Sequence, residues 1–187
     1  ERIIEVTAEE EGSVVVSARL FSDIIRKLPN EEIMIEEQEN KSIVIKCLSS
    51  EFTIVGQPAD DFPNIGEIQE EKKLFLEKDI LKDMIKKTSF AASIDESKGI
   101  IVGVLIEMEE ESLNMVALDG FRMAITRETM KNEEKKRIII SARILNEINK
   151  IITENEENKE IYMILEDKKA VFLLEDTKIV LRLLEGD

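Results

Sequence analysis

The 187-residue sequence contains no histidine and no tryptophan, and only one cysteine, one tyrosine and three prolines. Without histidine, the chain lacks Ser-His-Asp and Cys-His nucleophiles, and most catalytic zinc sites are excluded. The single Cys47 cannot form a disulfide within the chain, and its apolar run predicts a buried, inert thiol in a reducing cytoplasm. No apolar run approaches the roughly 20 residues that a membrane-spanning helix needs.

The motifs that bind nucleotide phosphates are also missing. Neither Gly-x-x-x-x-Gly-Lys-Ser/Thr nor Gly-x-Gly-x-x-Gly occurs. The chain has 41 acidic and 26 basic residues, a net charge of −15 that argues at first against nucleic acid. Because acidic residues are so frequent, the first interpretation of any of them is solvated surface. This applies also to Asp95 and Glu96, for which a pair of metal ligands is the alternative. We expect no metal and no cofactor.

What the sequence does contain is a repeat. Residues 14–28 read VVVSARLFSDIIRKL, and residues 138–152 read IIISARILNEINKII. Both stretches begin with three β-branched residues, continue with Ser-Ala-Arg, and end in a pattern typical of an amphipathic helix. A third start of this kind lies near residue 74. The spacing predicts a unit of one strand, one helix and about three strands, roughly 60 residues long, arranged in larger modules of about 125 residues.

The apolar periodicity places the elements of each unit. It predicts helices over 17–28, 78–89 and 141–152, the first with Ser17 as its N-cap. GQPADDFPNIG at 56–66 reads as a connection between units. The predicted strands are 2–8, 13–16, 31–37, 42–47, 51–56, 74–76, 100–107, 112–118, 121–128, 137–140, 160–166, 169–174 and 178–184.

Positive charge gathers on the predicted helices. Their formal charges are +2, +2 and +1, so the rest of the chain carries −20. Charged residues commonly solvate an amphipathic helix, and that is the simplest interpretation. Three equivalent helices, all positive on a negative chain, also predict one surface that follows a polyanion through its phosphates.

The chain resembles the bacterial DNA polymerase III β subunit, the sliding-clamp family, in segments that occur in the family's order and spacing. VVVSARLFSDIIRKLP is similar to the last helix of the family's first domain, and QPADDFPNI to the linker after it. LEKDILKDMIKKTSFAAS, VALDGFRMAI, RIIISARILNEINKI and LRLLEGD are similar to segments of the second domain. One departure is Phe121, where family members commonly carry a polar residue.

The resemblance implies an α+β DNA-clamp fold, with repeated strand–helix–three-strand units, antiparallel sheets outside and helices on one face. It assigns 1–60 to the end of the first domain, 61–71 to an interdomain linker and 72–187 to the second domain, with the third domain absent. Family members are rings of two chains around duplex DNA, and this piece is not expected to close one. The implied role is non-enzymatic and cytoplasmic, associated with the nucleoid during replication: a processivity factor that binds polymerase, clamp loader and repair proteins.

The resemblance also implies two sets of site residues. The second-domain wall of a hydrophobic peptide-binding pocket would be formed by Ile101, Leu118, Gly120, Phe121, Arg122 and Met123. From the pattern alone, these residues also fit an ordinary strand core followed by a hairpin turn. The residues facing DNA would be Arg19, Arg26, Lys27, Lys82, Lys86, Lys87, Lys98, Arg143 and Lys150.

Two other functions compete with this one. The first is a non-enzymatic repeat scaffold that binds only peptides and whose helix charges are incidental. The second is a hydrolase with a paired Asp and Glu, which ranks last because nothing in the sequence selects such a pair.

Overall fold

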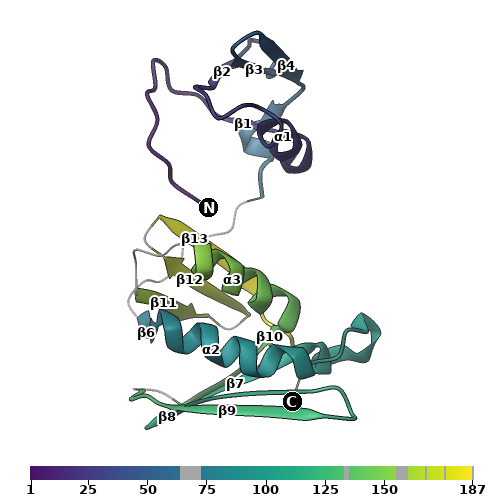
Figure 1. The fold of residues 1–187 in the computed structure, drawn as a ribbon, viewed down its shortest axis with the longest axis vertical. Coiled ribbons are helices and arrows are strands. Elements are labelled where there is room, and N and C mark those ends of the chain that lie inside the picture. The colour runs from purple at the N-terminus through teal and green to yellow at the C-terminus, as the bar shows by residue number, and fades with distance from the viewer. Residues whose placement is uncertain (64–72, 133–134, 155–159, 167, 175, 187) are drawn as a thin grey trace. The chain divides into compact units, whose positions relative to one another are not determined.

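The structure is a computed structural model that describes residues 1–63, 73–132, 135–154, 160–166, 168–174 and 176–186 (Figure 1). It contains two compact units. Unit 1 comprises Glu1–Ile4 and Glu67–Asp187, and unit 2 comprises Glu5–Gly66. The division into 1–60, a linker over 61–71 and 72–187 stays a prediction, and residues 64–71 of that linker lie outside the described residues. None of the described helices is long and apolar enough to cross a membrane.

Unit 2 holds one copy of the repeat. Helix α1 begins after Ser17, whose hydroxyl accepts a hydrogen bond from the Leu20 amide at 3.5 Å, so the predicted N-cap is confirmed. The central strand of its antiparallel sheet ends at Cys47, which is buried as predicted. The elements are β1 (Val14–Val15), α1 (Ala18–Ile25), β2 (Met34–Glu37), β3 (Ile43–Cys47), β4 (Ser50–Ile54), β5 (Gln57–Pro58) and the 3₁₀ turn η1 (Ala59–Asp61).

The core of unit 2 is small. Ile43, Ile45 and Ile54 form its buried centre, on the face of the β2–β3–β4 sheet that α1 covers. Phe21 and Ile24 of α1 pack against this centre but remain partly exposed. All eight residues of α1 are described, and none of them is buried.

Unit 1 holds two copies of the repeat, and they exchange strands. The two antiparallel sheets have the orders β10-β7-β8-β9 and β13-β12-β11-β6, so each copy gives its first strand to the other copy's sheet. This confirms the predicted clamp-type α+β fold. The elements are β6 (Lys73–Glu77), α2 (Lys78–Thr88), η2 (Ser89–Ala91), η3 (Glu96–Val102), β7 (Gly103–Glu109), β8 (Ser112–Leu118), β9 (Met123–Thr129), β10 (Lys136–Ser141), α3 (Ala142–Glu154), β11 (Glu160–Leu165), β12 (Lys169–Leu174) and β13 (Thr177–Arg182).

The helices α2 and α3 lie together over the sheets of unit 1 (Figure 1). Ser89, directly after α2, donates a hydrogen bond from Oγ to Oδ1 of Asn146 in α3 at 2.9 Å. Leu81 and Met84 of α2 and Leu145 of α3 are almost fully buried in one core shared by both sheets. The apolar face of each helix therefore packs on this core, with Ile80, Ile144 and Ile151 partly buried at its margin, and packing removes most of that face from water.

Three predicted strands need correction. Residues 2–8 form no strand. Within this segment only Arg2 pairs with another part of the chain, through an isolated bridge to Thr177. Residues 100–102 belong to η3, where Gly99 adopts φ 64°, and β7 begins only at Gly103. The strand predicted over 31–37 begins at Met34. Residues 2–8 and 100–102 carry an apolar pattern but pair with no strand along their length, and a strand needs such a partner.

Candidate functional site

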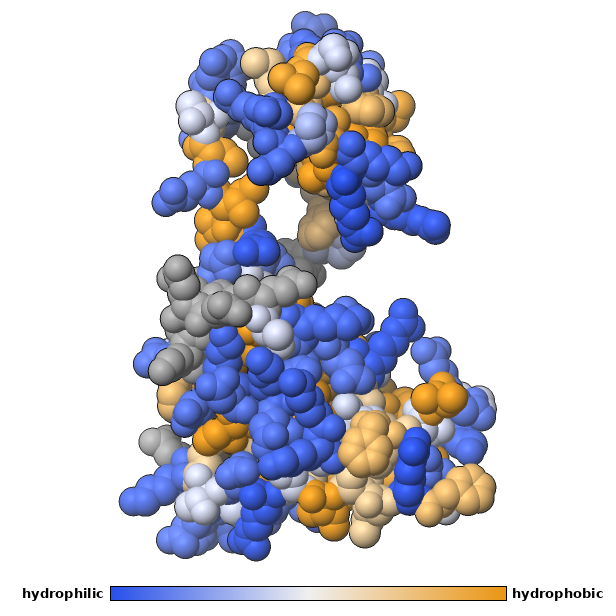
Figure 2. All heavy atoms as spheres, in the orientation of Figure 1, coloured by the Kyte–Doolittle hydropathy of each residue, from blue (hydrophilic) through white to orange (hydrophobic). Residues whose placement is uncertain are grey.

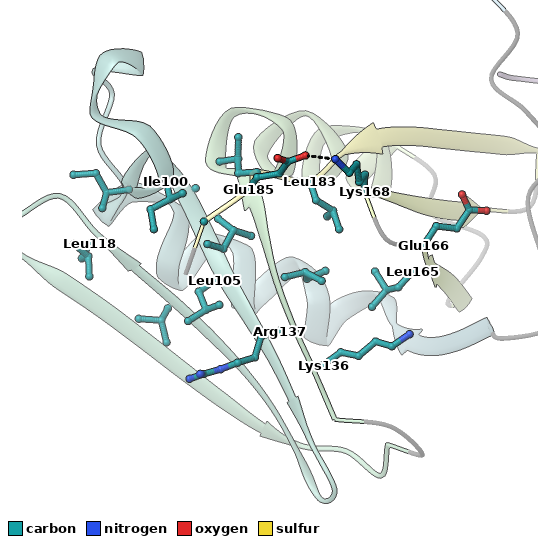
Figure 3. A pocket seen from close by; sticks show the side chains of 17 residues that line it. Ile100, Leu105, Leu118, Lys136, Arg137, Leu165, Glu166, Lys168, Leu183 and Glu185 are labelled. Carbon is teal, nitrogen blue, oxygen red and sulfur yellow. Dashed lines mark ion pairs between the residues drawn. The ribbon is translucent and has the colours of Figure 1, made fainter.

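A cavity of about 840 Å³ opens on unit 1, beside the sheet that β7, β8 and β10 help to form (Figure 3). Its other walls come from η3, from Leu165, Glu166 and Lys168, and from the chain that follows β13. The apolar lining includes Leu105, Val116, Leu118, Ile139, Leu165 and Leu184, and the charged lining is Lys136, Arg137, Glu166, Lys168 and Glu185.

Strand register builds the apolar wall. Ile139 of β10 pairs with Leu105 of β7, and Leu105 pairs with Val116 of β8, so the three side chains form one row across the sheet. Their neighbours Val104 and Ile106 point to the opposite face and are buried in the core. The sheet therefore presents an apolar row on each face, one to the core and one to the cavity.

The chain that follows β13 closes one side of the cavity. The Leu183 amide donates to the Lys168 carbonyl, and the Leu184 amide donates to the Ile139 carbonyl, both at 2.9 Å. Gly103 permits this approach: a Cβ at that position would lie 2.5 Å from Ile139 Cγ2 and 2.8 Å from Leu184 Cδ1. The cavity wall thus depends on a residue without a side chain.

Three of the charged side chains that line the cavity, Arg137, Lys168 and Glu185, form exposed ion pairs. Lys168 Nζ lies 3.0 Å from Glu185 Oε1, and this hydrogen bond lowers the pKa of Glu185. Arg137 donates from Nε to Glu107 Oε1 at 2.8 Å, and this contact raises the pKa of Arg137. Among the described lining residues there is no hydroxyl, thiol or imidazole side chain. The cavity is therefore equipped to bind apolar groups between paired charges.

Two of the six predicted pocket residues, Ile101 and Leu118, line this cavity. The other four, Gly120, Phe121, Arg122 and Met123, lie at the β8–β9 turn, next to Leu118 in sequence. They are not among the lining residues, although Met123 pairs with Leu118 across the two strands. The assignment of all six to a peptide pocket stays a prediction.

Asp119 holds the β8–β9 turn in shape. Its Oδ1 accepts from the amides of Phe121 at 2.9 Å and Arg122 at 3.1 Å, and its Oδ2 accepts from Arg122 Nε at 3.0 Å. The Phe121 amide is the main cause of the lowered pKa of Asp119, which the Arg122 contacts lower further and desolvation raises. Gly120 adopts φ 95°, which favours glycine. The turn leaves the Phe121 side chain 95% exposed.

Sequence reasoning did not single out Leu105, Val116, Ile139 or Leu165. A signal was present in β8, where Val116 lies two residues before Leu118 and so points to the same face. Leu184 could not be found this way. It follows β13 of one sheet, and its position in the cavity wall depends on its hydrogen bond to Ile139 in β10 of the other sheet.

The cations predicted to face DNA are accessible. Figure 2 shows that the surface over α2 and α3 is largely hydrophilic. Lys82 is partly exposed, and the other eight, Arg19, Arg26, Lys27, Lys86, Lys87, Lys98, Arg143 and Lys150, are exposed. Lys78, counted in the charge of its helix, is only 8% exposed and contributes no cation to that surface.

The helices differ in how their cations are paired. Lys87 forms an ion pair with Asp83, and Lys150 Nζ lies 2.8 Å from Glu147 Oε1. Arg143 lies 3.5 Å from Glu96. The remaining helix cations, Arg19, Arg26, Lys27, Lys82 and Lys86, form no ion pair with any residue that the structure describes.

Asp95 and Glu96 make separate contacts. Asp95 Oδ1 accepts hydrogen bonds from the Ser97 hydroxyl at 2.7 Å and the Ser97 amide at 3.1 Å, and the hydroxyl is the main cause of its lowered pKa. Glu96 forms the ion pair with Arg143. Within the described ranges, no group of three or more acidic, cysteine or histidine side chains is arranged to hold a metal ion.

Comparisons with known proteins agree with this architecture. The profile of the DNA polymerase III beta subunit, N-terminal domain, matches residues 1–66, and that of its central domain matches residues 75–187. The beta sliding clamp of Halalkalibacterium halodurans is 35% identical over 156 residues, which are 81% of this chain and 41% of that protein. The beta sliding clamp of Bacillus subtilis is 34% identical over 154 residues, with the same coverage.

Solved structures give the same result. A putative DNA polymerase III beta subunit from Eubacterium rectale superposes with a TM-score of 0.89 at 34% identity, covering 100% of this chain and 51% of that one. The DNA polymerase sliding clamp from Bacillus subtilis superposes with a TM-score of 0.88 at 29% identity, covering 97% and 48%. The chain spans about half the length of these structures and 41% of the curated relatives. With both domain profiles matched in order, the chain belongs to the DNA polymerase III beta subunit family.

Proposed function

We propose that the full-length protein is a sliding clamp, the processivity factor of a replicative DNA polymerase. It encircles duplex DNA without reading its sequence and holds the polymerase to it, and it has no catalytic role of its own. The full-length protein would form a two-chain ring and work on the nucleoid, in the cytoplasm. The observation that carries the proposal is that three equivalent helices bear exposed cations, while the rest of the chain is strongly negative.

The charge distribution supports a surface that follows phosphates. Lysine and arginine side chains held on helices can contact the DNA backbone without touching base edges. Each such contact is weak and salt-sensitive, which suits a protein that must move along the duplex. The negative remainder would repel DNA from other surfaces. Duplex DNA is therefore the partner proposed for the helix faces.

The cavity supports the second half of the proposal. Its aliphatic wall and paired charges are suited to apolar side chains of a short peptide from the polymerase, the clamp loader or a repair protein. The β8–β9 turn beside it offers further apolar surface, because Phe121 and Met123 are exposed. Ile101, Leu118 and the turn residues are proposed as one continuous peptide-binding wall.

The ring is tested with the full-length protein, loaded by its clamp loader onto nicked circular plasmid and gel-filtered at moderate salt. Half of the sample is linearised before the column. A clamp stays on circles and is lost from linear DNA, because it slides off the ends. Equal retention on both would mean ordinary electrostatic binding and would overturn the ring.

A peptide-binding scaffold remains the second candidate, favoured by one observation: Lys87, Arg143 and Lys150 are all already paired with acids. The double reversal Lys82→Glu and Lys86→Glu separates the two functions. If the protein is a clamp, the affinity of the double variant for DNA should fall at least about tenfold. If it is a peptide-binding scaffold, its affinity for peptides should be unchanged and DNA binding should not respond to the substitutions. Arg127→Glu with Lys131→Glu is the matched control, because both cations are exposed, form no ion pair with any described residue and lie outside the helices.

A further inference from the structure

Strand β10 offers a partly open edge to the cavity. It is the terminal strand of its described sheet and pairs with β7 from Lys136 to Ser141. On its other side, Lys136, Arg137, Ile138 and Ile139 all line the cavity. An edge of this kind presents backbone donors and acceptors with no strand beside them.

The direction of these backbone groups follows from one hydrogen bond. The Ile139 carbonyl accepts from the Leu184 amide at 2.9 Å, so the backbone groups of Ile139 point away from β7. In an antiparallel ladder this direction alternates, so the amide and carbonyl of Arg137 also point toward the cavity. Among the described residues, Leu184 provides the only backbone hydrogen bond to Arg137 or Ile139 on this side of β10.

Unit 2 contains a similar arrangement. There the strand before the helix, β1, pairs over both of its residues with β5, the chain that follows the last strand. In unit 1 the corresponding chain bonds to Ile139, the counterpart of Val15 in the repeat, and β10 extends beyond this point to Lys136. The Arg137 end of β10 therefore lies outside the part of the strand that is paired in unit 2.

The side chains and charges around the edge specify the occupant. Leu105, Ile139 and Leu165 would receive alternate apolar side chains of an extended chain. The charged lining includes Arg137, whose guanidinium forms an ion pair with Glu107. Both donors that Arg137 uses on Glu107 go to one oxygen, which leaves further guanidinium donors for an acid.

We propose that a partner peptide adds to β10 as an extended strand, pairing its backbone with Arg137 and placing an acidic residue against the Arg137 guanidinium. This inference rests on the proposed peptide-binding role of the cavity and states how that peptide is held. Backbone pairing supplies affinity, while the apolar row and the arginine select side chains.

The probe is a synthetic peptide, Glu-Leu-Thr-Leu-Thr-Leu-Glu with blocked ends, whose acids at both termini allow either strand direction. Two N-methylated versions carry methyl groups either on two leucine amides or on the two threonine amides. Alternate amides of a strand point to opposite sides, so only one version blocks pairing with β10. Binding to the full-length protein is measured by isothermal titration calorimetry.

One methylated version should bind about tenfold more weakly, because the amide that donates to the Arg137 carbonyl is lost, and the other should change affinity less than about twofold. Replacing both glutamates of the peptide by glutamine should weaken its binding to the unaltered protein about threefold. The same replacement should not change its affinity for the Arg137→Gln variant. Equal binding of both methylated versions would overturn strand addition and leave a pocket that reads side chains only. Absence of peptide binding would also overturn it, while retention on circular plasmid reports independently on the clamp.

Discussion

The two units contain the same strand–helix–sheet repeat, yet their helices are buried to different extents. In unit 1, α2 buries five residues, among them Leu81, Met84 and Ile85, and α3 buries Leu145 and Ile148. In unit 2, every residue of α1 is described and none is buried. All three helices have a clear apolar face. The difference shows that amphipathic periodicity fixes which side of a helix points inward, whereas burial depends on how many other elements cover that side.

The largest expected contrast comes from removing core side chains on equivalent helices. Leu145→Ala in α3 should cost about 3 kcal/mol, because a fully buried leucine leaves a cavity in an interlocked core. Ile24→Ala in α1 should cost about 1 kcal/mol, since that side chain is partly exposed. Hydrogen exchange in the 187-residue chain, read separately for each unit, measures both values.

Leu20→Ala is the control for this pair. Leu20 lies on α1 but is 47% exposed, so its loss should change the stability of unit 2 by less than about 0.5 kcal/mol. Equal costs for Leu145→Ala and Ile24→Ala would mean that α1 contributes as much to the stability of unit 2 as α3 contributes to that of unit 1.

A second contrast concerns the glycine beside the strand that precedes the helix in each unit. A Cβ on Gly56 would lie 2.3 Å from the Lys41 carbonyl oxygen, and one on Gly103 would lie 2.5 Å from a methyl carbon of Ile139. A carbonyl of the backbone yields less easily than a side chain. Gly56→Ala should therefore destabilise unit 2 by about 2 kcal/mol and Gly103→Ala should destabilise unit 1 by about 1 kcal/mol.

Gly12→Ala serves as the control for these substitutions. The nearest atom to its added Cβ is a carboxylate oxygen of Glu37, at the end of a flexible side chain. Its effect should stay below about 0.5 kcal/mol. If Gly103→Ala proves costlier than Gly56→Ala in the same exchange experiment, the Leu184 contact is more rigid than the turn at Lys41.

These contrasts show what the sequence could predict. The three helices were predicted to within about three residues at each end. Apolar residues at helical spacing fall on one face of an α-helix but on both faces of a strand. The strand over 2–8 was wrong because alternation alone does not supply a partner strand. The cavity row of Leu105, Val116 and Ile139 was missed, since an apolar residue on a strand's outer face cannot be told from a core residue until the register is known.

A smaller effect tests how ion pairs limit the helix cations. Asp83→Asn releases Lys87, whereas Asp79→Asn makes the same charge change on the same helix, where Asp79 forms no ion pair with any described residue. Asp83→Asn should raise the affinity of the full-length protein for duplex DNA about threefold at low salt. Asp79→Asn should raise it by less than about 1.5-fold. Fluorescence anisotropy with a short duplex measures the difference. Equal gains would show that only net charge matters and that pairing does not hold Lys87 back.

The smallest expected effect is the pH dependence of the β8–β9 turn. The amide of Phe121, and after it Arg122, hold the pKa of Asp119 below its ordinary value. Because the pKa is lower in the folded state, the stabilisation is complete above the unfolded value of about 3.9 and is lost as pH falls through the folded value. Exchange of the Phe121 and Arg122 amides should therefore be slow near neutral pH, and their protection should decrease only in acid below about pH 4.

Asp119→Asn separates charge from shape in this turn. The asparagine keeps an oxygen that can accept from both amides but carries no charge, so some protection should persist and its dependence on pH should disappear. A turn whose protection decreases equally in the unaltered protein and in Asp119→Asn would owe its acid sensitivity to other groups. In that case Asp119 would shape the turn that exposes Phe121 through hydrogen-bond geometry alone, and the charge of its carboxylate would contribute nothing to the turn.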